Sequence, residues 1–122
     1  ARRFWQSGCR APNSGSVRFV NCAFWGPCNQ IAKIGGPGTV GFSDCTFVQW
    51  DHKNQGRHAL QVEGGTVLVR GCEFQSGRPH IALAENVKRA IISDNVLPGA
   101  LRLDNRSRGK VKISNDSGDP EP

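Results

Sequence analysis

One eight-residue pattern recurs along this chain of 122 residues at a nearly constant spacing. Residues 17–24 (VRFVNCAF) are followed by close copies at residues 40–47 (VGFSDCTF) and 67–74 (VLVRGCEF). A weaker copy occupies residues 90–97, and residue 111 begins a further one, so the period lies between 21 and 27 residues. A period of this length indicates stacked structural repeats, each of which buries its apolar side against its neighbours.

A second, shorter pattern follows each copy of the first, at residues 32–36, 60–64, 81–84 and 101–105. Both patterns alternate apolar and polar residues with a period of two, which is typical of short β-strands. Gly, Asn and Asp stand at the ends of the patterns, where they permit left-handed or tight backbone turns. Outward residues of the second pattern would form the column Lys33, Gln61, Ala82 and Arg102.

These features predict an all-β fold, a right-handed parallel β-helix (solenoid) of about five short turns. A β-sandwich is the competing fold, but it has no reason to repeat one motif at such regular spacing. Equivalent residues of successive turns would stack about 4.8 Å apart. The expected inward columns are Val17, Val40, Val67, Ala90 and Val111; Phe19, Phe42, Val69, Ile92 and Ile113; and Phe24, Phe47, Phe74 and Leu97. At a sharp bend, Cys22, Cys45, Cys72 and Asn95 would stack as small residues able to bond the backbone.

The V-x-F-x-N/D-C-x-F units, each followed by a short strand ending in Gly-Gly or Asn, resemble the right-handed parallel β-helix of the pectate-lyase-like superfamily. The resemblance covers roughly residues 17–115. It implies a protein that acts on polysaccharides, as a lyase, glycosidase or esterase, or one that binds glycans. Because about five turns is few for this superfamily, we expect a C-terminal or truncated segment of a larger β-helix, or an unusually small β-helix.

The chain divides into three parts on this interpretation. Residues 17–115 carry the β-helix repeats, residues 1–16 form an N-terminal cap or the remnant of a preceding turn, and residues 116–122 form a polar tail. An open solenoid leaves unpaired strand edges at both ends. The sequence therefore suggests a homo-oligomer, or a larger parent chain, joined through the solenoid ends.

Charge and cysteine content bear on partners and location. The net charge of +6 favours anionic partners such as acidic glycans, although a basic surface also serves solubility alone. The few stacking aromatics argue against nucleic acid, and no apolar run is long enough to span a membrane. Of the five cysteines, Cys9 and Cys28 lie outside the repeat and could form a disulfide, which would indicate an oxidising, secreted location.

The loops that follow each Cys-x-Phe unit vary in length, and stacking would bring them to one edge of the solenoid. Trp offers a flat face for sugar rings, and Arg offers a fork for carboxylates. The predicted ligand-binding residues at this edge are Trp25, Trp50, Lys53, Arg57, Arg78 and His80. The predicted catalytic residues are Asp51, His52 and His58, with an imidazole as base and the carboxyl group as its partner or as an acid. The alternative is that the tryptophans pack the loops and the histidines are merely solvated.

Specific enzyme signatures are missing from the sequence. The cysteines and histidines lack zinc-site spacing, no run of acids could hold calcium, and no phosphate-binding loop is present, so we expect no metal or cofactor. No pair of carboxylates can be placed at glycosidase spacing. The sequence favours a module that binds polysaccharide, possibly acidic, at the loop-lined edge. A catalytic polysaccharide lyase or glycoside hydrolase domain, and a structural or assembly module without a ligand, remain as alternatives.

Overall fold

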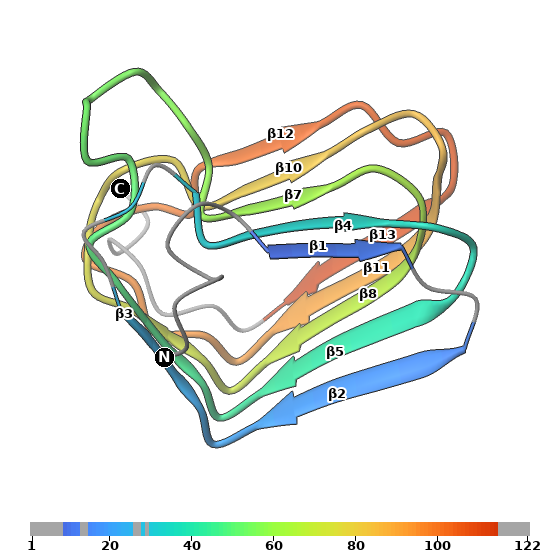
Figure 1. Ribbon diagram of the computed structural model, residues 1–122, viewed down its shortest axis with the longest axis horizontal. Coiled ribbons are helices and arrows are strands. Elements are labelled where there is room, and N and C mark those ends of the chain that lie inside the picture. Colours follow the sequence, from blue (N-terminus) through green and yellow to red (C-terminus); the bar gives the residue numbers. More distant parts are fainter. Residues whose placement is uncertain (1–8, 13–14, 26–27, 29, 115–122) are drawn as a thin grey trace.

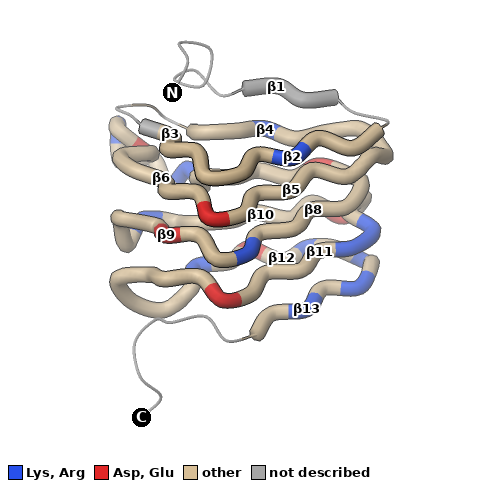
Figure 2. The backbone as a smooth tube through the Cα atoms, turned by 90° about the horizontal axis from the view of Figure 1, so that it is seen from below, with Lys and Arg blue, Asp and Glu red and all other residues tan. Residues whose placement is uncertain are grey.

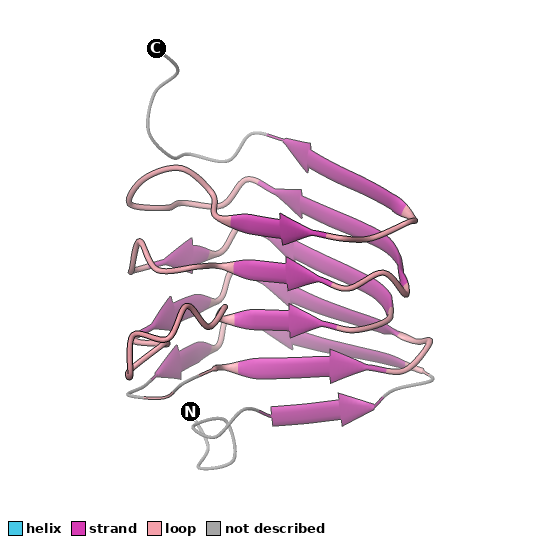
Figure 3. Ribbon diagram, turned by 90° about the horizontal axis from the view of Figure 1, so that it is seen from above, coloured by secondary structure: helices cyan, strands magenta, loops and turns pink. Residues whose placement is uncertain are grey.

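The computed structural model describes residues 9–12, 15–25, 28 and 30–114, and this part of the chain forms a parallel β-solenoid of about four turns. Successive windings contribute short strands to three parallel sheets, and equivalent strands of successive windings lie side by side (Figures 1 and 3). The described residues form strands and turns without any helix, so none is present there that could cross a bilayer. The all-β solenoid predicted from the repeat is confirmed.

The three sheets form the three sides of the solenoid. Sheet A consists of β1 (Cys9–Pro12), β4 (Ala32–Gly35), β7 (Leu60–Val62), β10 (Ile81–Leu83) and β12 (Leu103–Asn105). Sheet B consists of β2 (Ser16–Val20), β5 (Thr39–Ser43), β8 (Gly65–Arg70), β11 (Val87–Ser93) and β13 (Lys110–Ser114). Sheet C is smaller and consists of β3 (Ala23–Trp25), β6 (Thr46–Val48) and β9 (Glu73–Phe74).

The strand register matches the columns expected from the first pattern. In sheet B the paired residues are Val17 with Val40, Val40 with Val67, Val67 with Ala90, and Ala90 with Val111. In sheet C, Phe24 pairs with Phe47, and Phe47 pairs with Phe74. Like side chains therefore stack along the solenoid axis, which confirms the central expectation from the sequence.

Stacked phenylalanines form the middle of the core. The ring centroids of Phe24 and Phe47 lie 5.3 Å apart, and those of Phe47 and Phe74 lie 4.8 Å apart, with nearly parallel planes in both pairs. Phe42 packs edge-on against Phe47 from sheet B. All four of these side chains are buried, so the core runs continuously through the windings.

A sharp corner follows the strands β2, β5, β8 and β11 of sheet B. Asn21, Asp44, Gly71 and Asp94 occupy this corner with φ between 54° and 64°. These are residue types that tolerate the left-handed backbone conformation. Each of their backbone N–H groups donates to a carbonyl oxygen of the next winding, at distances of 2.9–3.2 Å. Asp44 N, for example, donates to the carbonyl oxygen of Arg70 at 3.1 Å. The turns predicted at these Asn, Asp and Gly residues are confirmed.

The residue after the corner bonds the backbone of the preceding winding. Cys72 Sγ lies 3.5 Å from the carbonyl oxygen of Phe42, and Asn95 Nδ2 donates to the equivalent carbonyl of Val69 at 3.2 Å. Asn95 Oδ1 also accepts from Cys72 N at 2.9 Å. The hydrogen bond with the Cys45 thiol, together with burial, raises the pKa of the Cys72 thiol, which therefore stays protonated. Cys and Asn are equivalent here because both are small and reach the same carbonyl group.

The last strand of sheet A is displaced from its expected register. Ala82 pairs with Asp104, whereas the sequence pattern placed Arg102 in that column. The cause is visible in the backbone, since the carbonyl oxygen of Arg102 accepts hydrogen bonds from the N–H groups of His80 and Ile81. Residue 102 therefore lies just before the strand, and the predicted register of this winding is wrong by two residues.

Two expectations concern the N-terminal part of the chain. Cys28 is a free cysteine whose Sγ lies 3.8 Å from the carbonyl oxygen of Gln49, so the suggested disulfide with Cys9 is not formed. The side chain of Cys9 lies outside the described residues. Residues 9–12 of the expected cap form β1, which pairs with β4 in sheet A.

Candidate binding groove at the loop edge

The loops between sheet C and sheet A come together at one edge of the solenoid, where the loop of residues 49–59 protrudes furthest (Figure 1). They enclose an open groove of about 690 Å³. Its lining consists of Val48, Gln49, Trp50, His52, Gln75, Ser76 and Arg78. Three of the predicted site residues, Trp50, His52 and Arg78, therefore lie at one groove, as the stacking argument required.

Asp51 organises the protruding loop from inside. Its carboxylate is buried and accepts hydrogen bonds from the backbone N–H of Gln55 at 2.8 Å and of Gly56 at 3.1 Å. Asp51, Asn54 and Gly56 all have positive φ, so the loop follows a tight path around the carboxylate. The carboxylate thus fixes the loop shape by satisfying backbone donors that would otherwise be left unpaired.

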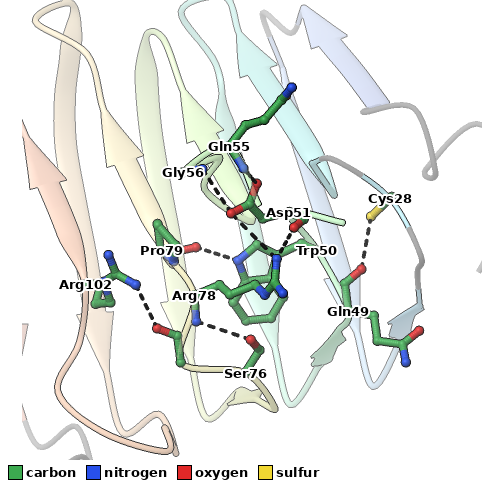
Figure 4. A network of polar contacts seen from close by, with 11 residues as sticks. Cys28, Gln49, Trp50, Asp51, Gln55, Gly56, Ser76, Arg78, Pro79 and Arg102 are labelled. Atoms are coloured by element: carbon green, nitrogen blue, oxygen red, sulfur yellow. Dashed lines mark hydrogen bonds and ion pairs between the residues drawn. The ribbon is translucent and has the colours of Figure 1, made fainter. Parts of the chain in front are cut away.

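Arg78 connects the next winding to this loop. Its Nη1 donates to the carbonyl oxygen of Asp51 and lies 3.9 Å from Oδ2 of the same residue (Figure 4). Burial alone would raise the pKa of Asp51, but the backbone N–H groups around its carboxylate and the Arg78 guanidinium hold it below its ordinary value. The Arg78 side chain remains 41% exposed, so the anchored guanidinium also faces solvent at the groove.

Trp50 is a core residue despite its place in the loop. Only 1% of it is exposed, and its Nε1 donates to the carbonyl oxygen of Pro79 at 2.6 Å. Its ring packs edge-on against Phe74 with centroids 5.9 Å apart. Trp50 therefore packs the loop onto the solenoid and presents no exposed ring face at the groove. The side chain of Trp25 lies outside the described residues.

His80 is also a structural residue. It is completely buried, its Nε2 lies 2.9 Å from the carbonyl oxygen of Ser76, and its Nδ1 accepts from the N–H of Arg102 at 2.9 Å. These partners fix the neutral tautomer with the proton on Nε2. Burial is the main cause that lowers the pKa of His80. With both nitrogens hydrogen-bonded and the ring buried, His80 has no polar atom left to offer at the groove.

This arrangement makes the stability of the fold dependent on pH. The folded-state pKa of His80 lies below its ordinary value of 6.5, so the unfolded chain binds the proton more readily. The contribution of neutral His80 to the free energy of unfolding is fully present above about pH 6.5. It is lost as the pH falls below this value, by up to about 1.4 kcal/mol per pH unit. Urea unfolding at pH 7.5 and 5.5 should show lower stability at pH 5.5. His80→Gln should weaken this dependence, and equal wild-type stability at both pH values would contradict the assignment.

The remaining predicted residues differ in exposure. His52, Lys53 and Arg57 are exposed on the protruding loop, and His58 is half-buried at its end. Burial is the main cause that lowers the pKa of His58. The described contacts of the Asp51 carboxylate are with backbone N–H groups and Arg78, not with an imidazole. The predicted catalytic residues thus lie on one loop without forming a hydrogen-bonded acid–base pair.

Four groove residues were not predicted from the sequence, namely Val48, Gln49, Gln75 and Ser76. Their position gives a signal that could have found them. Because Phe47 pairs with Phe74, the first loop residues after these two phenylalanines stack at the mouth of the same groove. Arg102 adds a further exposed cation at this edge, with Nη1 donating to the carbonyl oxygen of Gly77 at 3.0 Å.

Within the described residues, no group of three or more His, Cys, Asp or Glu side chains is arranged to hold a metal ion. Comparison of the chain with protein-family models, with curated protein sequences and with solved structures finds no match.

Proposed function

We propose that this chain is a β-solenoid module, related to the pectate-lyase-like group, that binds an acidic polysaccharide in the loop-edge groove. The observation that carries the proposal is the anchored, half-exposed guanidinium of Arg78 at a groove of about 690 Å³. Holding the guanidinium on Asp51 reduces the entropy that it would lose on binding a carboxylate. An extracytoplasmic location, where such polymers occur, is part of the proposal.

The charges around the groove support an anionic ligand. Its described lining includes Arg78 and His52 but no carboxylate. Lys53 and Arg57 are exposed on the adjoining loop, and the carboxylate of Asp51 is buried beneath it with its own partners. Cations around a groove attract anionic chains, whereas the amides of the lining can bond sugar hydroxyl groups.

The arrangement favours binding over catalysis. A general acid must carry a proton near neutral pH and must reach the substrate. The carboxylate of Asp51 is buried and its pKa is lowered, so it meets neither condition. The resemblance of the repeat to polysaccharide-active β-helices supports a glycan as the ligand class, and the groove chemistry supports an acidic one.

Calorimetric titration with oligogalacturonate and with alginate oligomers tests the proposal, with a neutral glucan as the negative control. Arg78→Ala should weaken binding about 10–100-fold, because hydrogen bonds to charged groups contribute roughly 1.5–3 kcal/mol. Since Arg78 also holds the loop, the double variant Lys53→Ala/Arg57→Ala gives a second test at exposed residues. High salt should also weaken binding by the wild-type chain, because salt screens the attraction between exposed charges.

A matched control lies on the outer face of sheet B, which carries Arg18, Arg70, Arg89, Lys110 and Lys112 (Figure 2). Arg89 is exposed there and pairs with Lys110 and Thr66 in the strand register. Arg89→Ala removes the same charge as Arg78→Ala and should leave affinity within about twofold. Wild type that binds neither acidic glycan, or affinity that depends on Arg89 and not on Arg78, would overturn the proposed groove.

A further inference from the structure

The outer face of sheet B carries charge of one sign only. The five strands of this sheet contain Lys and Arg but no Asp or Glu. The outward cations are exposed and project from one side of the solenoid (Figure 2). We call this side the cationic face, and its cations are Arg18, Arg70, Arg89, Lys110 and Lys112.

The cations of the cationic face form no ion pair with an acid among the described residues. Some cations on other sides of the solenoid are paired, as where Lys33 Nζ lies 3.7 Å from Oε2 of Glu63. At the corner after the strands, Asp44 and Asp94 line a hollow together with Arg70 but lie beyond ion-pair distance. An anionic partner could therefore contact this face without breaking an ion pair within the described chain.

Two apolar side chains lie in the middle of the cationic face. Leu68 and Ile91 are neighbours in the strand register, and Ile91 is 39% exposed. In the same row, Lys112 lies next to Ile91. On the other side, Arg18 lies across Gly41, with its Nη1 3.3 Å from the position that a Cβ would take there. The face is therefore apolar at its middle and positively charged around it.

We propose that the cationic face binds the surface of a bilayer that contains anionic lipids. Anionic headgroups attract Lys and Arg side chains, and apolar side chains among those cations can enter the boundary between headgroups and acyl chains. A nucleic acid or an acidic protein segment would match the cations but would place charged groups against Leu68 and Ile91. Binding of this kind lies on the membrane and requires no spanning segment. It uses a different side of the solenoid from the loop-edge groove, so it is independent of glycan binding.

Co-sedimentation with lipid vesicles tests the proposal. At about 0.1 M salt, the wild-type chain should bind vesicles of phosphatidylcholine with about one third phosphatidylserine, and not vesicles of phosphatidylcholine alone. Arg89→Gln/Lys112→Gln should weaken this binding about 10–30-fold, because both cations face the headgroups. Lys33→Gln/Arg106→Gln is the matched control, since it removes the same charge in β4 and just after β12, on the sheet A side. Salt screens charges so far from the bilayer, so the control should change affinity less than about threefold.

A third variant distinguishes a bilayer from other polyanions. Ile91→Ser keeps every charge and should weaken binding to the anionic vesicles about three- to tenfold, because less apolar surface is buried. Duplex DNA and polyglutamate serve as the other polyanionic probes, and the wild-type chain should bind both more weakly than the vesicles. Absence of binding to the anionic vesicles, equal losses for the two double variants, full binding by Ile91→Ser, or tighter binding to either polyanion would overturn the proposal.

Discussion

Replacing Phe47 with alanine is expected to reduce the free energy of unfolding by about 3–5 kcal/mol. Phe47 is completely buried between the rings of Phe24 and Phe74, and Phe42 packs against it from sheet B. Alanine would remove the buried ring and leave a cavity that the backbone, held in register by strands on both sides, cannot close. A domain of this size has a total stability of about 5–15 kcal/mol, so the loss is a large part of it.

Denaturant unfolding followed by circular dichroism measures this loss. Val20→Ala is the control, since Val20 lies in β2 with 59% of its surface exposed and should lose less than about 0.5 kcal/mol. A loss below about 1 kcal/mol for Phe47→Ala would mean that the phenylalanine column is not packed as described.

Replacing Gly65 with alanine is expected to reduce the free energy of unfolding by about 2–5 kcal/mol. Gly65 has a φ of +73°, and an added Cβ would lie 2.3 Å from the carbonyl oxygen of Gly38 and 2.7 Å from that of Gly36. These atoms belong to the backbone of the preceding winding and cannot rotate away. The effect therefore comes from the close stacking of the turns between sheets A and B.

Substitutions at two other glycines distinguish the cost of a positive φ from the cost of the close backbone contact. Gly56 has a φ of +78° with nothing near its Cβ position, so Gly56→Ala should cost only about 1–2 kcal/mol from the backbone conformation. Gly35 has open space and no positive φ, so Gly35→Ala should be nearly neutral. Thermal unfolding of the three variants should give this order, and equal effects of Gly65→Ala and Gly56→Ala would argue against stacked turns.

The fold could be predicted from the sequence because each side chain type recurs at the same place in every winding. Val40 and Val67 differ in their neighbours along the chain but share one structural environment, so the repeat itself records the packing. The corner was predictable for the same reason, since Asp44 and Gly71 can both adopt the left-handed conformation. The predicted strand register was wrong at Arg102 in the last winding, where the copy of the pattern is weak.

The site was harder to predict because exposure does not follow from position in a loop. Trp50 and His80 lie in variable connections, yet both turn inward and bond backbone carbonyl groups. The carboxylate of Asp51 likewise turns inward to its own loop. Loop residues have no periodic pattern that separates inward from outward side chains, so only Arg78 and the exposed loop residues remain as candidate ligand contacts.

The stacking of windings in parallel register is tested most directly by NMR scalar couplings across backbone hydrogen bonds. The couplings that matter join the N–H groups of Thr46, Glu73 and Val96 to the carbonyl groups of Cys22, Cys45 and Cys72, respectively, across distances of 2.8–2.9 Å. All three should be observed in one sample. Their absence, or reciprocal couplings between two residues as in antiparallel pairs, would contradict the parallel solenoid and the groove that depends on it.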